Sequence, residues 1–215
     1  METNQVLSAK QQSITPIAAF TANGSLEKLK TALNEGLDAG LTVNEIKEIL
    51  VQLYAYTGFP RSLNGISTFI GVMEERENKG LKDEKGKEAN LFPANINSIE
   101  LGTEIQTRLA GKPVTGAIFT FTPAIDQFLK GHLFGDIFGR DNLDFQSREI
   151  ATISALSSME GVNSQLQAHF SIGFNTGLTE TQMRNLIAVL EIKVGKKEAD
   201  NANDVLGKVI SNKAK

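Results

Sequence analysis

The sequence of 215 residues contains no cysteine and no tryptophan, and it has only two histidines. The lack of cysteine excludes disulfides, thiolate metal sites, iron–sulfur clusters and every mechanism with a cysteine nucleophile. Two histidines are too few for a metal centre built from several imidazoles, and we expect no metal and no cofactor. No run of about 18 apolar residues occurs, so the sequence predicts no membrane-spanning segment.

The sequence also has no large excess of positive or negative charge. The formal net charge is −3, and the chain has no basic arm, so we expect no nucleic-acid partner. Apolar residues make up 40% of the sequence and charged residues 22%, which is typical of a folded globular protein. The polar N-terminal segment lacks the apolar centre of a signal peptide. We therefore expect a cytoplasmic protein, unless a leader was removed before the first residue.

Apolar residues recur at spacings of three and four, which predicts an all-α fold. The predicted helices span 7–21, 25–39, 43–57, 61–79, 97–109, 123–137, 145–159, 162–176, 180–194 and 197–212. Ala117–Phe121 is the one stretch with β-like character. Thr42 and Thr179 each begin a capping box at a helix start. Gly40 and Gly177 precede them and are expected to end the previous helices in the left-handed conformation.

The chain also repeats itself. Leu7–Phe20 aligns with Leu143–Leu156 at an offset of 136 residues, and Gly24–Leu50 aligns with Gly161–Ile187 at an offset of 137. Apolar positions match in both pairs, and turn glycines and the capping Thr match in the second pair. The repeat predicts an internal duplication, with two helical units related by a pseudo-twofold axis.

The predicted units differ in completeness. The first and shorter unit would span 1–79, and the second and more complete one would span 95–215. The segment 80–94 is polar, rich in Lys, Glu and Gly, and has no apolar period, so it is the natural linker between them.

One acid and one histidine of the second unit are candidates for chemistry. Glu149 is in register with Ile153 at the edge of an apolar stripe, and His169 is expected to lie half-buried on the next helix. If these helices form an antiparallel hairpin, the carboxylate and the imidazole approach each other. Such a contact fixes the tautomer of the ring and prepares a general acid or base near neutral pH. The alternatives are a packing role for His169 and a first-turn dipole role for Glu149. The first unit has Ser13 and Ala32 at these positions and cannot form the pair.

Other polar residues suggest a pocket less specifically. His132 would be a second acid or base, or bind a carboxylate, or be a surface residue near a helix end. Arg140 and Arg148 would bind an anionic substrate bidentately, or be solvated. Tyr56 would line the pocket, or be a packed aromatic with a hydrated hydroxyl. Walker A, Rossmann, GxSxG and HExxH motifs do not occur.

Several segments together resemble the carboxymuconolactone decarboxylase family. They are 51–64, 101–111, 135–150 (GDIFGRDNLDFQSREI), 165–169 (QLQAH) and 175–180 (NTGLTE). The resemblance covers almost the whole chain. It implies the all-helical fold shared with alkylhydroperoxidase D. It also implies a homo-oligomer, with a ring-like trimer as the expected arrangement of a two-unit chain.

The resemblance also bears on activity. The peroxidase branch of the superfamily carries Cys-x-x-Cys before the histidine, at positions that correspond to Val162 and Gln165. Since neither residue supports thiol chemistry, we expect no peroxidase or disulfide-reductase activity. The decarboxylase-like branch remains, in which a carboxylated muconolactone loses CO2 without a cofactor.

On this resemblance His169 is the acid or base and Glu149 orients it. The candidates for binding the substrate are Arg148, Arg140, His132, Tyr56 and Gln165. We expect a carboxy-lyase acting on a small carboxylated lactone or acid. Two alternatives stay open: a non-catalytic helical oligomer or small-acid-binding protein with a degenerate site, and a different proton-transfer enzyme that uses the same pair.

Overall fold

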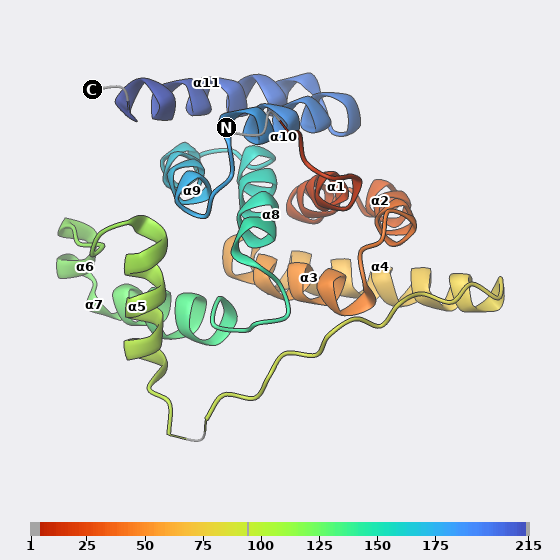
Figure 1. The fold of residues 1–215 in the computed structure, drawn as a ribbon, viewed down its shortest axis with the longest axis horizontal. Helices are drawn as coiled ribbons and strands as arrows, with labels where there is room; N and C mark the ends of the chain where they lie inside the picture. Colours follow the sequence, from red (N-terminus) through yellow and green to blue (C-terminus); the bar gives the residue numbers. More distant parts are fainter. Residues whose placement is uncertain (1–4, 94, 214–215) are drawn as a thin grey trace.

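The structure is a computed structural model that describes residues 5–93 and 95–213. These residues form eleven α-helices and one π-helix without any β-strand, which confirms the all-α prediction (Figure 1). The elements are α1 (Ala9–Asn23), α2 (Leu26–Asp38), α3 (Val43–Thr57), α4 (Phe59–Asn78), α5 (Ser98–Ala110), α6 (Ala117–Phe121), α7 (Pro123–Gln127), η1 (Phe128–Ile137), α8 (Phe145–Ser157), α9 (Asn163–Asn175), α10 (Glu180–Lys193) and α11 (Lys196–Lys213). Parts of the predicted units and linker, at 1–4, 94 and 214–215, lie outside the described residues. None of the described helices is long and apolar enough to cross a bilayer.

Two segments differ from the prediction. Ala117–Phe121, expected to have β-like character, forms the short helix α6, none of whose residues is buried. Its aromatic and β-branched residues favour a strand only where a pleated surface offers them packing, and no described strand lies beside it. The single helix predicted over 123–137 is α7 followed by the π-helix η1. Apolar spacing does not separate the two helix types, because their bonding differs by only one residue.

The predicted helix ends are confirmed. Thr42 and Thr179 both form capping boxes, with Glu45 and Gln182 as their partners. Gly40 has φ of 93° and Gly177 has φ of 95°, where a residue with a side chain would be strained. These devices fix where α3 and α10 begin, and so they set the register of both helices in the core.

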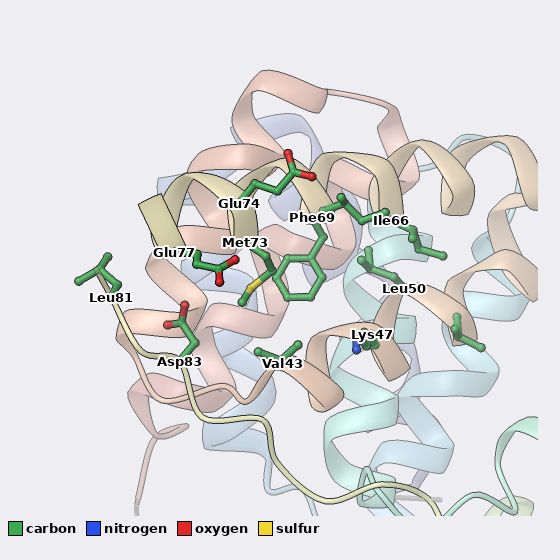
Figure 2. A pocket seen from close by; sticks show the side chains of 12 residues that line it. Val43, Lys47, Leu50, Ile66, Phe69, Met73, Glu74, Glu77, Leu81 and Asp83 are labelled. Carbon is green, nitrogen blue, oxygen red and sulfur yellow. The ribbon is translucent and has the colours of Figure 1, made fainter. Parts of the chain in front are cut away.

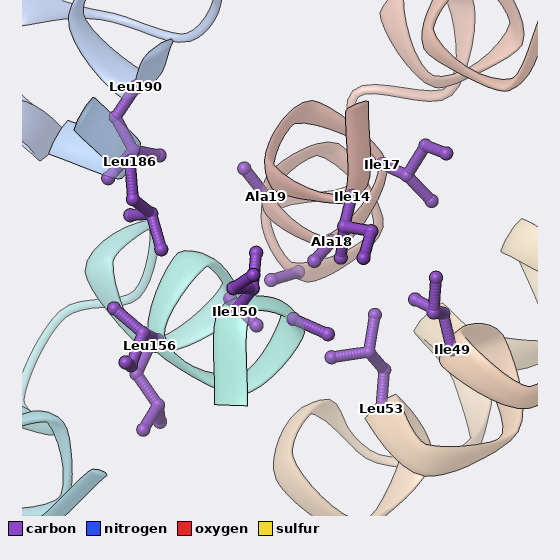
Figure 3. Packing of buried hydrophobic residues seen from close by; sticks show 14 of the residues in the cluster. Ile14, Ile17, Ala18, Ala19, Ile49, Leu53, Ile150, Leu156, Leu186 and Leu190 are labelled. Atoms are coloured by element: carbon purple, nitrogen blue, oxygen red, sulfur yellow. The ribbon is translucent and has the colours of Figure 1, made fainter. Parts of the chain in front are cut away.

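The main core lies where α1 crosses α8 (Figure 3). Ile14 and Ala18 of α1 face Ile150 of α8, while Leu53 of α3 and Leu190 of α10 close the cluster from either side. All five side chains are buried. Alanines on both crossing helices let the two backbones approach closely. Helices from the N-terminal and the C-terminal half of the chain therefore share this core.

The order of helices recurs along the chain. The helices α2, α3 and α4 begin at Leu26, Val43 and Phe59, and α9, α10 and α11 begin at Asn163, Glu180 and Lys196, each 137 residues later. Helix α8 begins 136 residues after α1, at Phe145 and Ala9 respectively. These spacings equal the two offsets of the sequence repeat.

A second, smaller core forms where α5 crosses η1, and it extends to Ile172 of α9. Glycines make this crossing possible. A β-carbon added at Gly102 would overlap the carbonyl oxygen of Lys130, and one added at Gly135 would overlap that of Ser98. The two helices therefore touch through their backbones, and every larger residue at these points is excluded.

The segment between α4 and α5 runs extended along the molecule (Figure 1). Its carbonyl groups cap the start of α3: the Val43 N–H donates to Glu84 O over 3.0 Å, and the Asn44 N–H donates to Lys85 O over 2.9 Å. First-turn amides of a helix have no partner within the helix. The predicted linker thus satisfies two of these amides and is bound to the first half of the chain.

The α5–η1 crossing can be tested by substitution. Gly102→Ala should lower the free energy of unfolding by about 1–3 kcal/mol or more, because the added methyl group meets backbone atoms that cannot rotate away. Gly207→Ala in α11, where nothing lies within 4 Å of the added carbon, is the matched control. It should be neutral or stabilising by up to about 1 kcal/mol. Equal effects in chemical denaturation would contradict backbone contact at the crossing.

Candidate functional site

Glu149 and His169 meet inside the hairpin of α8 and α9. Asp144 caps α8, with its Oδ1 accepting from the Ser147 N–H over 2.8 Å, and this places Glu149 in the second turn. The Nδ1 atom of His169 lies 2.8 Å from Oε2 of Glu149. The Glu149 side chain is 0% exposed and that of His169 only 10%. His169 is thus more deeply buried than the half-buried position expected from its helix face.

The contact defines the state of the imidazole. An ionised carboxylate only accepts hydrogen bonds, so Nδ1 carries the proton and Nε2 keeps its lone pair in the neutral ring. Nε2 makes no hydrogen bond to a described residue, and it is not fully buried. The second carboxylate oxygen of Glu149, Oε1, is buried without a partner. A buried acceptor of this kind is costly unless a water or a ligand completes it.

Tyr56 of α3 forms one wall of this pair. Its ring meets the His169 ring edge-on, at 5.4 Å between centroids and 78° between planes. The hydroxyl group is buried away from bulk solvent. Burial raises the pKa of Tyr56, the charge of Glu149 raises it further, and Thr152 and Arg148 oppose the change. The phenol therefore stays neutral through the physiological range.

The side chain of Arg148 is completely buried and has no contact with solvent. Its Nη2 donates to Oε1 of Glu48 over 2.9 Å, and its Nη1 donates to Oε1 of Gln52 over 3.0 Å. Burial lowers the pKa of the Arg148 guanidinium, and the charge of Glu48 counteracts this. Arg140 also binds Glu48, with Nε 2.9 Å from Oε2, and keeps 39% of its side chain exposed. Both arginines thus hold a carboxylate of the chain itself.

The sequence analysis missed Glu48 and Gln52. They lie four residues apart on α3, in one stripe with Asn44, and all three side chains are buried. A polar stripe on an amphipathic helix usually faces solvent, so no local signal in the sequence indicated a buried carboxylate. Only the burial of Arg148 shows that a counter-charge is needed there. A substrate carboxylate can reach the buried Arg148 only by replacing Glu48, whereas Arg140 contacts Glu48 through Nε alone and keeps 39% of its side chain exposed.

His132 lies apart from this group, and Gln165 lies one turn before His169 on α9 but, among the described residues, forms no hydrogen bond with the pair. His132 is on η1 with 49% of its side chain exposed, and its Nδ1 contacts Oδ2 of Asp136 at 2.9 Å. Its ring neighbour is Tyr54, not Tyr56. Gln165 is exposed in the first turn of α9. The structure thus brings together Glu149, His169 and Tyr56 but does not gather all predicted residues in one pocket.

The largest cavity is elsewhere. It has a volume of about 680 Å³ and lies between α3 and α4, with Leu50, Ile66, Phe69 and Met73 on its walls (Figure 2). None of the five most prominent cavities of the described residues is lined by Glu149 or His169. The described residues also contain no cluster of three or more His, Asp or Glu side chains suited to a metal ion. Of the pair, only His169 has an exposed part, which is 10% of its side chain.

Comparison with models of protein families gives a match for the first part of the chain. Residues 1–67 match the model of the carboxymuconolactone decarboxylase family. The chain contains a carboxymuconolactone decarboxylase family domain. The matched segment runs from α1 into α4, and it includes Glu48, Gln52 and Tyr56 but not Glu149 or His169. A search of curated proteins found no match.

The arrangement around Glu48 predicts a large stability effect. Glu48→Gln leaves the buried guanidinium of Arg148 without a counter-charge, so the free energy of unfolding should fall by about 3–5 kcal/mol. Glu75→Gln removes the partner of Lys30 on the surface, where solvent screens the charges, and should have little effect. Chemical denaturation of the two variants compares them directly. A small effect of Glu48→Gln would contradict the buried ion pair.

Proposed function

We propose that this carboxymuconolactone decarboxylase family protein is a cofactor-independent lyase or proton-transfer enzyme that acts on a small carboxylated lactone or acid. His169 is the general acid or base, and Glu149 orients it. The observation that supports this most is the pairing of a fully buried carboxylate with Nδ1, which leaves Nε2 as the free nitrogen of the ring. The same arrangement prepares catalytic imidazoles in unrelated proteins.

The proposed reaction balances without a cofactor. The bond between the substrate carbon and its carboxylate breaks, CO2 leaves, and the electron pair stays on the carbon framework as an enolate. Nε2 of protonated His169 then delivers a proton to that framework, and water restores the proton on the ring. Glu149 stabilises the imidazolium that this cycle requires. The neutral Tyr56 hydroxyl supplies a hydrogen-bond donor beside the ring.

Two observations favour the alternative of a non-catalytic oligomer or small-acid-binding protein. Arg148 is buried and engaged by Glu48, so it offers no free charge to a substrate carboxylate. His169 is not among the residues that line five prominent cavities of the described residues. On this alternative, Glu149 and His169 stabilise the α8–α9 hairpin and carry out no reaction.

The internal duplication forms part of the proposal. The equal spacing of helix starts in the two halves supports two units related by a pseudo-twofold axis. Ser13 and Ala32 then occupy the positions of Glu149 and His169. Each chain accordingly has one site of this kind, built from α8 and α9 with Tyr56 contributed by α3.

Exposed apolar residues support self-association of the chain, which we propose to be a ring-like trimer. In α6, Phe121 is 90% exposed and Ile118 is 64% exposed. Apolar patches of this kind on soluble proteins mark interaction sites. Phe121→Ala should therefore shift the equilibrium toward monomers in analytical ultracentrifugation, whereas Ala substitution of the exposed Ile192 on α10 should not. A wild-type chain that is monomeric at high concentration would contradict the assembly.

The lyase proposal predicts the effect of removing the imidazole. His169→Ala should lower turnover of 4-carboxymuconolactone by at least about 100-fold, the usual effect of losing a general acid or base. Glu149→Gln, which keeps the shape but removes the charge, should lower kcat more than it changes KM. Ultraviolet absorbance follows the loss of substrate.

Ser164→Ala, an exposed change on the same helix, is the control and should keep wild-type rates. Lack of turnover by the wild-type chain would remove this substrate. Unchanged rates in a folded His169→Ala variant would assign the ring to packing.

A further inference from the structure

A second imidazole–carboxylate pair lies on η1. Nδ1 of His132 is 2.9 Å from Oδ2 of Asp136, and the hydroxyl of Ser98 donates to Oδ1 of the same carboxylate over 2.7 Å. Asp136 is thus held by α5 on one side and holds the imidazole on the other. Nδ1 carries the proton in this contact, which leaves Nε2 as the ring nitrogen available to a ligand.

The fold builds this chain of hydrogen bonds through the glycine crossing. Gly135, next to Asp136, packs against the backbone of Ser98, and this places the hydroxyl beside the carboxylate. The π-helix bonding of η1 sets His132 and Asp136 in adjacent turns on one face. π-Helical turns occur frequently at functional sites. The orientation of His132 is therefore fixed by two helices and not by its own helix alone.

A cavity of about 280 Å³ opens at His132. Its walls are mostly apolar, and Tyr54, Phe59 and Phe128 contribute three aromatic rings. Tyr54 and Phe59 stack at 4.4 Å between centroids, the Tyr54 ring lies 5.6 Å from the imidazole, and Phe128 exposes 66% of its surface. The nearby charges of Lys130 and Asp126 neutralise each other over 2.6 Å. The imidazole is thus the distinctive polar group of an apolar pocket, which is the usual composition of a small-molecule site.

We propose that this cavity binds a small aromatic acid, such as a phenol or a benzoic acid, separately from Glu149 and His169. The acidic group meets Nε2 of His132, and the ring packs against Phe59 and Phe128. A phenol donates its hydroxyl proton to the lone pair of Nε2, whereas a benzoate anion accepts from the N–H of the imidazolium form, which Asp136 stabilises. The size of the cavity limits the ligand to about one ring.

The main competitor is a second copy of the chain that covers the same aromatic residues. A protein surface would bury Phe59 and Phe128 but has no need of an oriented imidazole. The hydrogen-bonded order of Ser98, Asp136 and His132 favours a ligand with a polar group directed at one atom. The experiment distinguishes a second copy of the chain from a small ligand.

The chain has two histidines, which makes the test direct. In proton NMR of the full chain, each imidazole Cε1–H signal is assigned with His132→Ala and His169→Ala. Titration with phenol and with benzoate should move the His132 signal saturably and leave the His169 signal in place. Toluene, which has the ring but no acidic proton, should bind at least about tenfold more weakly than phenol.

Matched variants separate the pocket from the surface around it. Phe128→Ala should weaken binding of phenol about tenfold, and Asp136→Asn should weaken it as well, while Ala substitution of the exposed Ile70, outside the cavity, should not. Absence of a saturable shift at His132, or equal effects of Phe128→Ala and Ile70→Ala, would overturn the proposal. So would dissociation of an oligomer by Phe128→Ala without any ligand shift, which would assign the patch to a second copy.

Discussion

The buried carboxylate of Glu48 controls the geometry of the whole site. It sits on α3 and binds the guanidinium of Arg148 on α8, so the two halves of the chain are joined at a point that water cannot reach. Consecutive residues of a helix point about 100° apart. Once Arg148 is directed at α3, Glu149 has to point toward α9, where it meets His169. The ion pair inside the core thus determines the rotation of α8 and, through it, the contact between carboxylate and imidazole.

Much of the fold could be predicted because its signals are local. Apolar spacing located nearly all helices within two residues, and capping boxes with their preceding glycines fixed the starts of α3 and α10. The α5–η1 crossing was not predicted, although Gly131, Gly135 and Gly139 recur at a spacing of four residues. That pattern indicates close helix contact only when the partner helix is known. Ala117–Phe121 was misjudged because its residue types favour a strand that has nothing to pair with.

The candidate site was partly predictable for the same reason. The approach of Glu149 and His169 follows from two neighbouring helices in a hairpin, so sequence spacing was enough to suggest it. The positions of Arg140 and Arg148 depend on Glu48, which lies about 100 residues away along the chain. A local sequence pattern does not predict contacts between residues so far apart. Tyr56 likewise comes from the other half. Side chains that bridge distant segments require the tertiary structure.

Because the two halves share one core, the segment that carries the family signature and the segment that carries the reactive side chains need not coincide. Residues 1–67 match the family, yet the acid and the imidazole belong to α8 and α9. On the proposed function, the matched segment supplies Tyr56 as a wall and Glu48 as a counter-charge, while the proposed acid and imidazole lie on α8 and α9. Mutagenesis confined to the matched residues would then reach the supporting side chains and leave Glu149 and His169 untouched.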